Sequence, residues 1–176
     1  MSVEKLARPE IVAMKPYSSA RKEAPGKGIL LNANEAPRSL LDSEGGLNRY
    51  PDPQPERLVR RLARLYGVME DNVLVTRGSD EGIDLLTRVF CRAGQDAILQ
   101  CPPAFGMYRI AAQAQGARVV NVARDATDFS LDAQAVLDTL AGDDGIKLVY
   151  MTSPSNPTGD ALEDGFLERL LDLAES

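Results

Sequence analysis

The sequence contains no histidine and only 2 cysteines among its 176 residues. These residues therefore lack the side chain that most often serves as a general acid or base near neutral pH and as a metal ligand. Cys91 and Cys101 lie within apolar stretches. We expect two buried, reduced thiols in a cytoplasmic protein rather than a disulfide, and we expect no metal site.

Clustered positive charge and long apolar runs are also missing. The sequence has 20 Lys and Arg residues against 26 Asp and Glu residues, a net charge of −6, which argues against non-specific binding to nucleic acid. No apolar run approaches the length of a membrane span. The first fifteen residues include Glu4 and Glu10 and no hydrophobic stretch, unlike a secretory signal. We therefore expect a cytoplasmic globular protein that acts on small molecules, without a nucleic-acid or membrane partner.

Short runs rich in apolar and β-branched residues alternate with segments of helical spacing. The predicted strands are residues 73–76, 97–101, 118–122 and 147–152. The predicted helices are residues 55–66, 79–92, 108–115, 133–140 and 166–175. Such alternation is typical of βαβ units that form a mostly parallel sheet with helices on both faces. The sequence therefore predicts an α/β fold of three layers.

The first fifty residues have a different character, because they contain four prolines and several glycines. We expect one short helix followed by an extended N-terminal arm in residues 1–50. Residues 51–176 would then form the α/β domain.

Distinctive turn residues follow three of the four predicted strands. These loops are Arg-Gly-Ser-Asp-Glu-Gly at 77–82, Pro-Pro-Ala-Phe-Gly at 102–106 and Ser-Pro-Ser-Asn-Pro-Thr-Gly at 153–159. Loops that follow parallel strands emerge at the same carboxyl edge of the sheet, where open α/β sheets bind ligands. The sequence therefore predicts one ligand site built from all three loops.

Each loop has both a functional and a structural interpretation. The turn at Gly78, Ser79 and Asp80 opens onto a helix N-terminus and could hold a phosphate, or Ser79 could simply cap the helix. Phe105 could stack on a flat aromatic ligand or fill the core. Asn156 could donate a hydrogen bond to a ligand or stabilise a turn. The occurrence of all three at one edge favours the ligand site.

Six segments resemble the histidinol-phosphate aminotransferases, a family of fold-type-I enzymes that use pyridoxal 5'-phosphate. They occur in the family's order, with suitable spacing, at residues 31–35, 48–51, 77–82, 101–103, 106–108 and 153–159. The Asn-Pro-Thr-Gly of the last segment is shared by many fold-type-I aminotransferases. The Asn-Glu pair of the arm, the Arg-Tyr-Pro segment and the loop at 77–82 narrow the resemblance to this family.

The resemblance implies a role for each predicted site residue in the three loops that follow the strands. Gly78, Ser79 and Asp80 would hold the phosphate of pyridoxal 5'-phosphate. Phe105 would stack on the pyridine ring, where many relatives have tyrosine. Asn156 would donate a hydrogen bond to the 3-oxygen of the ring, from a loop in which a cis peptide before Pro157 is expected.

Three further residues acquire roles only through the resemblance. Tyr50 would reach the cofactor phosphate of the neighbouring subunit in a homodimer. Tyr17 and Asn34 would bind substrate in a mobile arm. Without the resemblance, both tyrosines would be interpreted as surface or interface residues.

The family transfers an amino group between L-histidinol phosphate and 2-oxoglutarate, giving imidazole acetol phosphate and glutamate, in histidine biosynthesis. The Schiff-base lysine of the family, its pyridine-binding aspartate and its substrate-binding arginines have no counterpart in residues 1–176. Neither Lys27 nor Lys147 lies in a suitable context. We therefore expect a truncated large domain without a catalytic residue, inactive by itself. The alternatives are a related aminotransferase, a phosphothreonine decarboxylase or a non-catalytic module.

Overall fold

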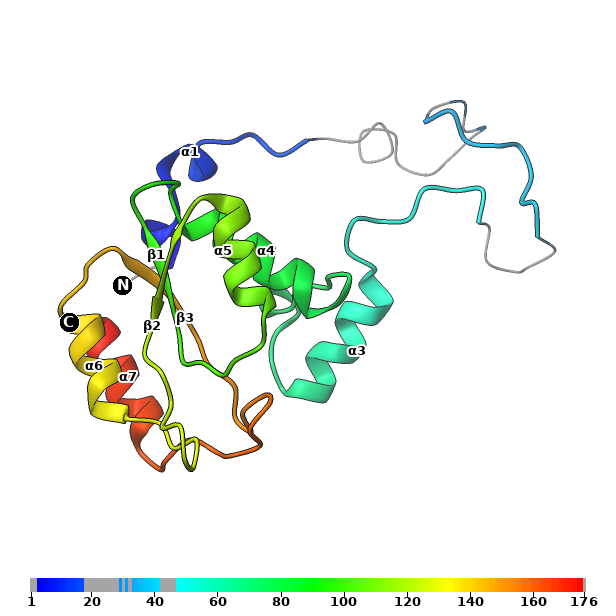
Figure 1. Ribbon diagram of the computed structural model, residues 1–176. Coiled ribbons are helices and arrows are strands. Elements are labelled where there is room, and N and C mark those ends of the chain that lie inside the picture. Colours follow the sequence, from blue (N-terminus) through cyan, green and yellow to red (C-terminus); the bar gives the residue numbers. More distant parts are fainter. Residues whose placement is uncertain (1–2, 18–28, 30, 32, 42–46, 176) are drawn as a thin grey trace. The chain divides into compact units, whose positions relative to one another are not determined.

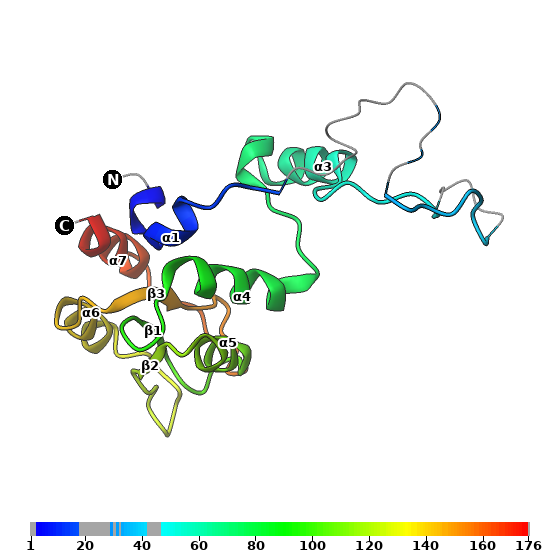
Figure 2. The ribbon, with the colours of Figure 1, turned by 90° about the horizontal axis from the view of Figure 1, so that it is seen from above.

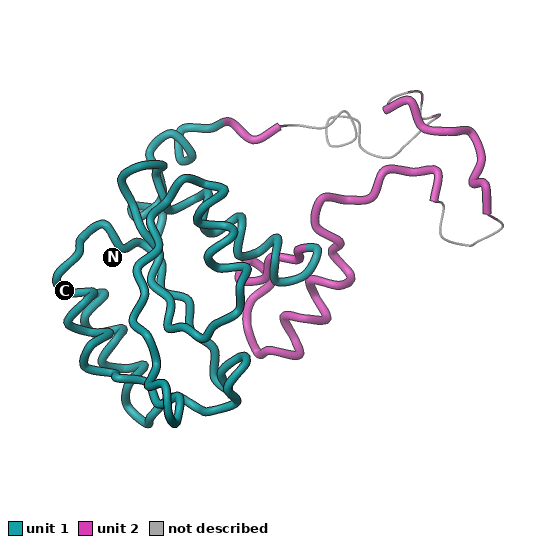
Figure 3. The backbone as a smooth tube through the Cα atoms, viewed as in Figure 1, with its two compact units in different colours: residues 1–14, 77–176 teal, residues 15–76 magenta. Residues whose placement is uncertain are grey.

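A computed structural model of the chain describes residues 3–17, 29, 31, 33–41 and 47–175 (Figure 1). The chain divides into two compact units (Figure 3). The arm unit consists of residues 15–76, and the sheet unit consists of residues 1–14 together with residues 77–176. Within the described residues, no helix has both the length and the hydropathy needed to cross a membrane.

The sheet unit is built on three parallel strands, β1 (Ala97–Gln100), β2 (Arg118–Asn121) and β3 (Ile146–Tyr150). Their order is β2-β1-β3, so the first strand in the chain is the central one. All four residues of β1 are buried. A strand covered on both faces needs apolar residues on both, which is why this run does not alternate with polar residues. Three of the four predicted strands are thus confirmed.

Helices cover both faces of this sheet (Figure 2). On one face lie α4 (Gly78–Phe90) and α5 (Met107–Gln115), and on the other lie α6 (Ala133–Ala141) and α7 (Phe166–Glu175). The arm unit contains α3 (Glu56–Tyr66) and the short 3-10 helix η2 (Glu70–Asn72). The five predicted helices are therefore confirmed, with ends that differ by no more than two residues, and the structure has the expected α/β fold.

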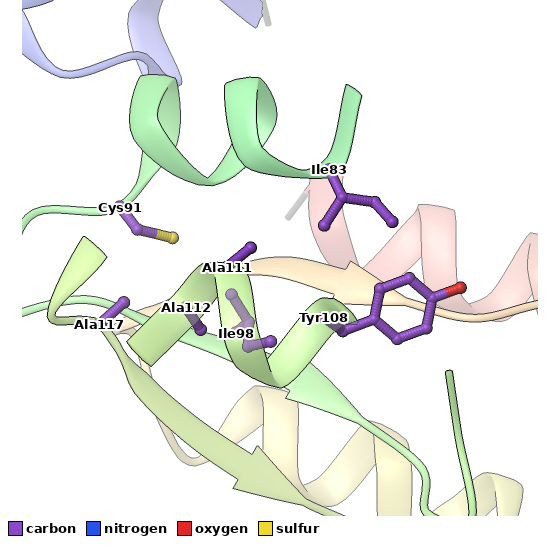
Figure 4. Close-up of a cluster of buried hydrophobic side chains, with 7 residues drawn as sticks. All are labelled: Ile83, Cys91, Ile98, Tyr108, Ala111, Ala112 and Ala117. Atoms are coloured by element: carbon purple, nitrogen blue, oxygen red, sulfur yellow. The ribbon is translucent and has the colours of Figure 1, made fainter. Parts of the chain in front are cut away.

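The central strand divides the core into two clusters. Ile98 points to one face and joins Ile83 of α4 and Tyr108 of α5 (Figure 4). Leu99 points to the other face and joins Val136 of α6. Successive side chains of a strand point to opposite faces, so two adjacent residues anchor all three layers.

Both cysteines are free and buried, as expected. Cys91 belongs to the cluster beneath α4 and α5, and Cys101 belongs to the cluster on the opposite face. Burial raises the pKa of each thiol to about 11, because the thiolate is poorly solvated there. A thiol with so high a pKa is a weak nucleophile at neutral pH, so both side chains serve the core.

The short N-terminal helix that the sequence predicts is also present. The 3-10 helix η1 (Val3–Leu6) leads into α1 (Pro9–Val12). Between them, the backbone N–H of Arg8 donates to the carbonyl oxygen of Val89 at 2.9 Å, and its guanidinium donates to the carbonyl oxygen of Arg88 at 3.0 Å. The last turn of a helix leaves carbonyl groups without partners, so Arg8 both satisfies them and complements the negative end of α4.

The predicted strand at residues 73–76 is wrong, because these residues pair with no strand among the residues that the structure describes. The backbone N–H of Val75 instead donates to Oε1 of Gln54 at 2.8 Å, and Nε2 of Gln54 donates to the carbonyl oxygen of Val75 at 2.9 Å. A strand requires a neighbouring strand, and the described part of the arm unit offers none. One amide side chain satisfies Val75 in its place.

Candidate functional site

The strand order creates a switch point beside the central strand. From β1 the chain continues to α5 on one face of the sheet, whereas from the adjacent β3 it continues to α7 on the other face (Figure 2). The loops at 101–106 and 151–165 therefore leave neighbouring parallel strands in opposite directions. In open α/β sheets, ligands bind in the crevice that such diverging loops create at the carboxyl edge.

Helix α4 brings a third segment to the same edge, because it runs antiparallel to the strands. In the first half of α4, the carbonyl oxygen of Ile83 accepts a hydrogen bond of 3.1 Å from the hydroxyl of Tyr150, the last residue of β3. Beyond its end, the thiol of Cys91 lies 3.8 Å from the carbonyl oxygen of Ala97, the first residue of β1. Gly78, the first residue of α4, therefore lies at the carboxyl edge with the loops that carry Phe105 and Asn156.

The N-terminus of α4 has no serine cap, so the structural interpretation of Ser79 is not confirmed. The helix begins at Gly78, whose φ of +80° lies in the left-handed region that favours glycine, and Arg77 is its cap residue. The carboxylate of Glu81 reaches back to accept the Arg77 N–H at 2.6 Å. Since Glu81 takes this role, the side chains of Ser79 and Asp80 make no hydrogen bond within the described residues and are exposed.

The first turn of α4 carries two acids, Asp80 and Glu81, and the second of them is paired with a cation. The Arg77 guanidinium lies 3.0 Å from Glu81. The N–H and then the guanidinium of Arg77 hold the pKa of the Glu81 carboxyl below its usual range. This acid is therefore ionised and paired with a cation, which partly offsets the charge that it would present to a bound phosphate. The backbone N–H groups of the first turn and the positive end of the helix dipole then favour an anion.

An aromatic row fixes Phe105 against the rest of the sheet unit. The ring of Phe105 meets that of Tyr108 edge-on at 5.7 Å between centroids, and Tyr108 stacks on Tyr150 at 4.6 Å. The Tyr150 hydroxyl bonds the hydroxyl of Thr87 at 3.0 Å and, as described, the backbone of α4. Burial raises the pKa of both tyrosines, so they remain neutral. Phe105 itself is partly exposed, which leaves ring surface free for a ligand.

The third predicted side chain, Asn156, is exposed on the loop that follows β3. Its backbone N–H donates to Oγ1 of Thr152 at 3.1 Å, so the loop folds back on the end of the strand. The peptide between Asn156 and Pro157 is cis, which confirms that prediction. The neighbouring Ser155 is buried and anchors the loop.

The remaining predicted residues, Tyr17, Asn34 and Tyr50, belong to the arm unit and are exposed. Glu35 joins two of the segments that carry the family resemblance. Its carboxylate accepts the backbone N–H of Tyr50 at 2.7 Å and pairs with the guanidinium of Arg49 at 2.6 Å. The part of the arm around Tyr50 is thereby ordered, and the roles of the three residues in a shared site stay a prediction.

Sequence reasoning missed Tyr108 and Tyr150, which link Phe105 to α4. The available signals were modest. Tyr108 follows Phe105 by three positions at the start of a predicted helix, and Tyr150 occurs near the end of a predicted strand, directly before a turn-rich loop.

Comparison with known proteins agrees with this arrangement. A family model described as "Aminotransferase class I and II" matches residues 20–176. The chain is 45% identical over 177 residues to histidinol-phosphate aminotransferase of Pectobacterium atrosepticum. The aligned region covers 99% of this chain and 48% of the relative. It is 44% identical over 178 residues to the enzyme of the same name from Serratia proteamaculans, with the same coverage. The chain thus spans about half the length of the curated relatives that it matches.

Among solved structures, the fold resembles histidinol-phosphate aminotransferase of Sinorhizobium meliloti in complex with pyridoxal 5'-phosphate. The TM-score is 0.61 and the identity is 24%. The similar region covers 72% of this chain and 33% of the other. At this identity the likeness supports the fold alone.

Proposed function

Because the chain belongs to the class I and II aminotransferases, we propose that it supplies the pyridoxal-phosphate-binding edge of a histidinol-phosphate aminotransferase. The reaction transfers an amino group between L-histidinol phosphate and 2-oxoglutarate. In the same proposal the enzyme is a cytoplasmic homodimer. Tyr50 serves the cofactor phosphate of the neighbouring subunit, and Tyr17 and Asn34 contact substrate.

The residues at the carboxyl edge fit the three chemical parts of pyridoxal 5'-phosphate. The phosphate suits the N-terminus of α4, where the Ser79 hydroxyl makes no hydrogen bond within the described residues. The flat ring suits the partly exposed face of Phe105, and the ring 3-oxygen suits an amide donor such as Asn156. When bound, the cofactor supplies an electron sink for the carbon that loses its proton.

The contribution of this chain is binding and orientation. The first turn of α4 and the Ser79 hydroxyl would donate to the phosphate oxygens and fix one end of the cofactor. Phe105 would cover one face of the ring and exclude water from it. Asn156 would fix the rotation of the ring about its long axis. The general acid or base of the reaction is not assigned to any of these residues.

The observation that carries the proposal is the convergence of three loops at a switch point, in a chain with 43–45% identity to histidinol-phosphate aminotransferases. The whole protein, at its full natural length, should transfer the amino group of L-histidinol phosphate to 2-oxoglutarate. Steady-state kinetics with L-histidinol phosphate and with aromatic amino acids as alternative donors provides the test. A preference of about tenfold or more in kcat/KM for a donor without a phosphate would contradict the substrate assignment.

Replacing Asn156 by alanine is expected to weaken binding of pyridoxal 5'-phosphate by about ten- to a hundredfold, since a hydrogen bond to a charged group contributes roughly 1.5–3 kcal/mol and every 1.4 kcal/mol is about tenfold in affinity. Equilibrium dialysis of the apoprotein of full natural length against the cofactor measures this change. The matched control is Asn72→Ala, an exposed asparagine of η2 in the arm unit, which should leave the affinity unchanged. Equal affinities in the wild type and Asn156→Ala would remove Asn156 from the site.

A further inference from the structure

A buried arginine links the loops at the carboxyl edge. The side chain of Arg124, which follows β2, is only 4% exposed. Its backbone N–H donates to the carbonyl oxygen of Pro102 at 2.8 Å, in the loop that carries Phe105. Its guanidinium donates to the carbonyl oxygen of Phe129 at 3.0 Å and forms an ion pair with the carboxylate of Asp160. Arg124 therefore contacts the loops that follow all three strands.

Asp160 holds the loop around Asn156 from both sides. Its carboxylate accepts a hydrogen bond from the hydroxyl of Thr158, two residues after Asn156. Its backbone carbonyl accepts the N–H of Ser155 at 2.7 Å, on the other side of Asn156. The N–H of Gly159 also donates to the carbonyl oxygen of Ser155 at 2.7 Å, which closes the turn. The geometry of the Asn156 backbone is thus set by contacts that lead to Asp160.

The charge of Asp160 is matched to the buried guanidinium. A buried cation requires a counter-charge, and Nε of Arg124 has no hydrogen-bond partner among the described residues. Two further acids, Asp128 and Glu163, line a cavity of about 230 Å³ together with Asp160. Hydrogen bonds from Thr158 and then from Arg124 hold the pKa of Asp160 below its usual range. Asp160 is therefore ionised at neutral pH and bound to Arg124.

We propose that Arg124 and Asp160 are positioning residues for Asn156, and that their ion pair sets the direction in which the Asn156 amide meets the cofactor. Neither residue lies in the segments that carry the family resemblance. Both act through the loop and neither needs to contact the cofactor. The proposal rests on the proposed cofactor role of Asn156.

The test is a double-mutant cycle on the full-length apoprotein, with affinity for pyridoxal 5'-phosphate as the readout. Asp160→Asn keeps an oxygen that can accept from Thr158 but removes the charge that pairs with Arg124. It should weaken cofactor binding about fivefold, the effect of one misaligned hydrogen bond. In an Asn156→Ala background the same substitution should change the affinity less than about twofold, because the contact through which it acts is already absent. Asp160→Glu, which keeps the charge, should restore most of the affinity and guards against a folding defect.

The control is Asp143→Asn, which removes the carboxylate charge that pairs with Arg118 at the opposite end of β2, where the arginine is half exposed, and it should leave the affinity unchanged. If Asn156→Ala weakens binding and Asp160→Asn does not, the positioning role is wrong while the cofactor site stands. If the losses of affinity caused by Asn156→Ala and Asp160→Asn multiply fully in the double variant, Asp160 acts on the fold in general and the proposal is also wrong. If Asn156→Ala has no effect, the cofactor role of Asn156 fails, and this inference fails with it.

Discussion

Phe166→Ala is expected to lower the free energy of unfolding by about 3–5 kcal/mol, the typical cost of removing a buried aromatic side chain. Phe166 is the first residue of α7 and is 2% exposed. It packs in one cluster with Leu99 of the central strand and Val136 and Leu137 of α6. Its removal would leave a cavity where two helices and the sheet meet. A typical domain is stable by only roughly 5–15 kcal/mol, so a large part of its stability depends on this side chain.

Urea denaturation monitored by circular dichroism measures this change, and the adjacent residue supplies the control. Leu167 is 52% exposed in the same helical turn, so Leu167→Ala should lower stability by less than about 1 kcal/mol. Phe166→Leu keeps most of the apolar volume, so its loss of unfolding free energy should lie between those of Leu167→Ala and Phe166→Ala. Equal losses for Phe166→Ala and Leu167→Ala would show that the core does not depend on Phe166.

The second large effect is expected for Asp96→Ala, about 2–3 kcal/mol at pH 7. The Asp96 side chain is only 3% exposed. Its carboxylate accepts from the backbone N–H of Arg92 at 2.7 Å and from the guanidinium at 2.9 and 3.2 Å. Arg92 is 47% exposed and remains solvated without its partner, so the loss stays below that of breaking a fully buried pair.

The Asp96 effect should depend on pH in a definite direction. Hydrogen bonding by Arg92 holds the pKa of Asp96 below its usual range. A group with a depressed pKa in the folded state stabilises the fold fully above its unfolded pKa of about 4, and this contribution is lost as pH falls through the folded value. The difference in unfolding free energy between wild type and Asp96→Ala should therefore shrink below about pH 4. Urea titrations at pH 7 and pH 3 measure it.

An exposed ion pair provides the comparison for Asp96. Asp84 and Arg88 of α4 form an i,i+4 pair at 2.7 Å, and their side chains are 36% and 60% exposed. Asp84→Ala should cost only about 0.3–0.5 kcal/mol. A loss for Asp96→Ala as small as that for Asp84→Ala would mean that burial adds nothing to this carboxylate.

Local patterns were sufficient for most of the secondary structure. Ala97, Ile98 and Leu99 are apolar at successive positions, as expected of a strand covered on both faces, and they form part of the central strand. The helix at 56–66 ends at Gly67, whose φ of 67° is the left-handed conformation expected of a glycine at that position. In both cases the residue type at a position follows directly from the local backbone conformation or burial, so the sequence is enough to predict it.

Contacts between distant residues could not be obtained in this way. Residues 73–76 have the composition of a strand, but composition does not reveal whether a neighbour is available. Arg124 and Asp160 are 36 positions apart, and nothing local marks either as buried or paired. For the site, turn residues predicted which loops matter, whereas the side chains that hold those loops in place became visible only in three dimensions.

The central place of β1 also has a consequence for the order in which the sheet assembles. Ile98 pairs with Val119, twenty-one positions later, and with Leu148, fifty positions later. The entropy of closing a chain segment grows with the logarithm of its length, so the second pairing costs about 0.8 kcal/mol more than the first. The contact between β1 and β2 is therefore expected to form before β3 adds to the other side. The loop of Asn156, which follows β3, would reach its final geometry only at that later step.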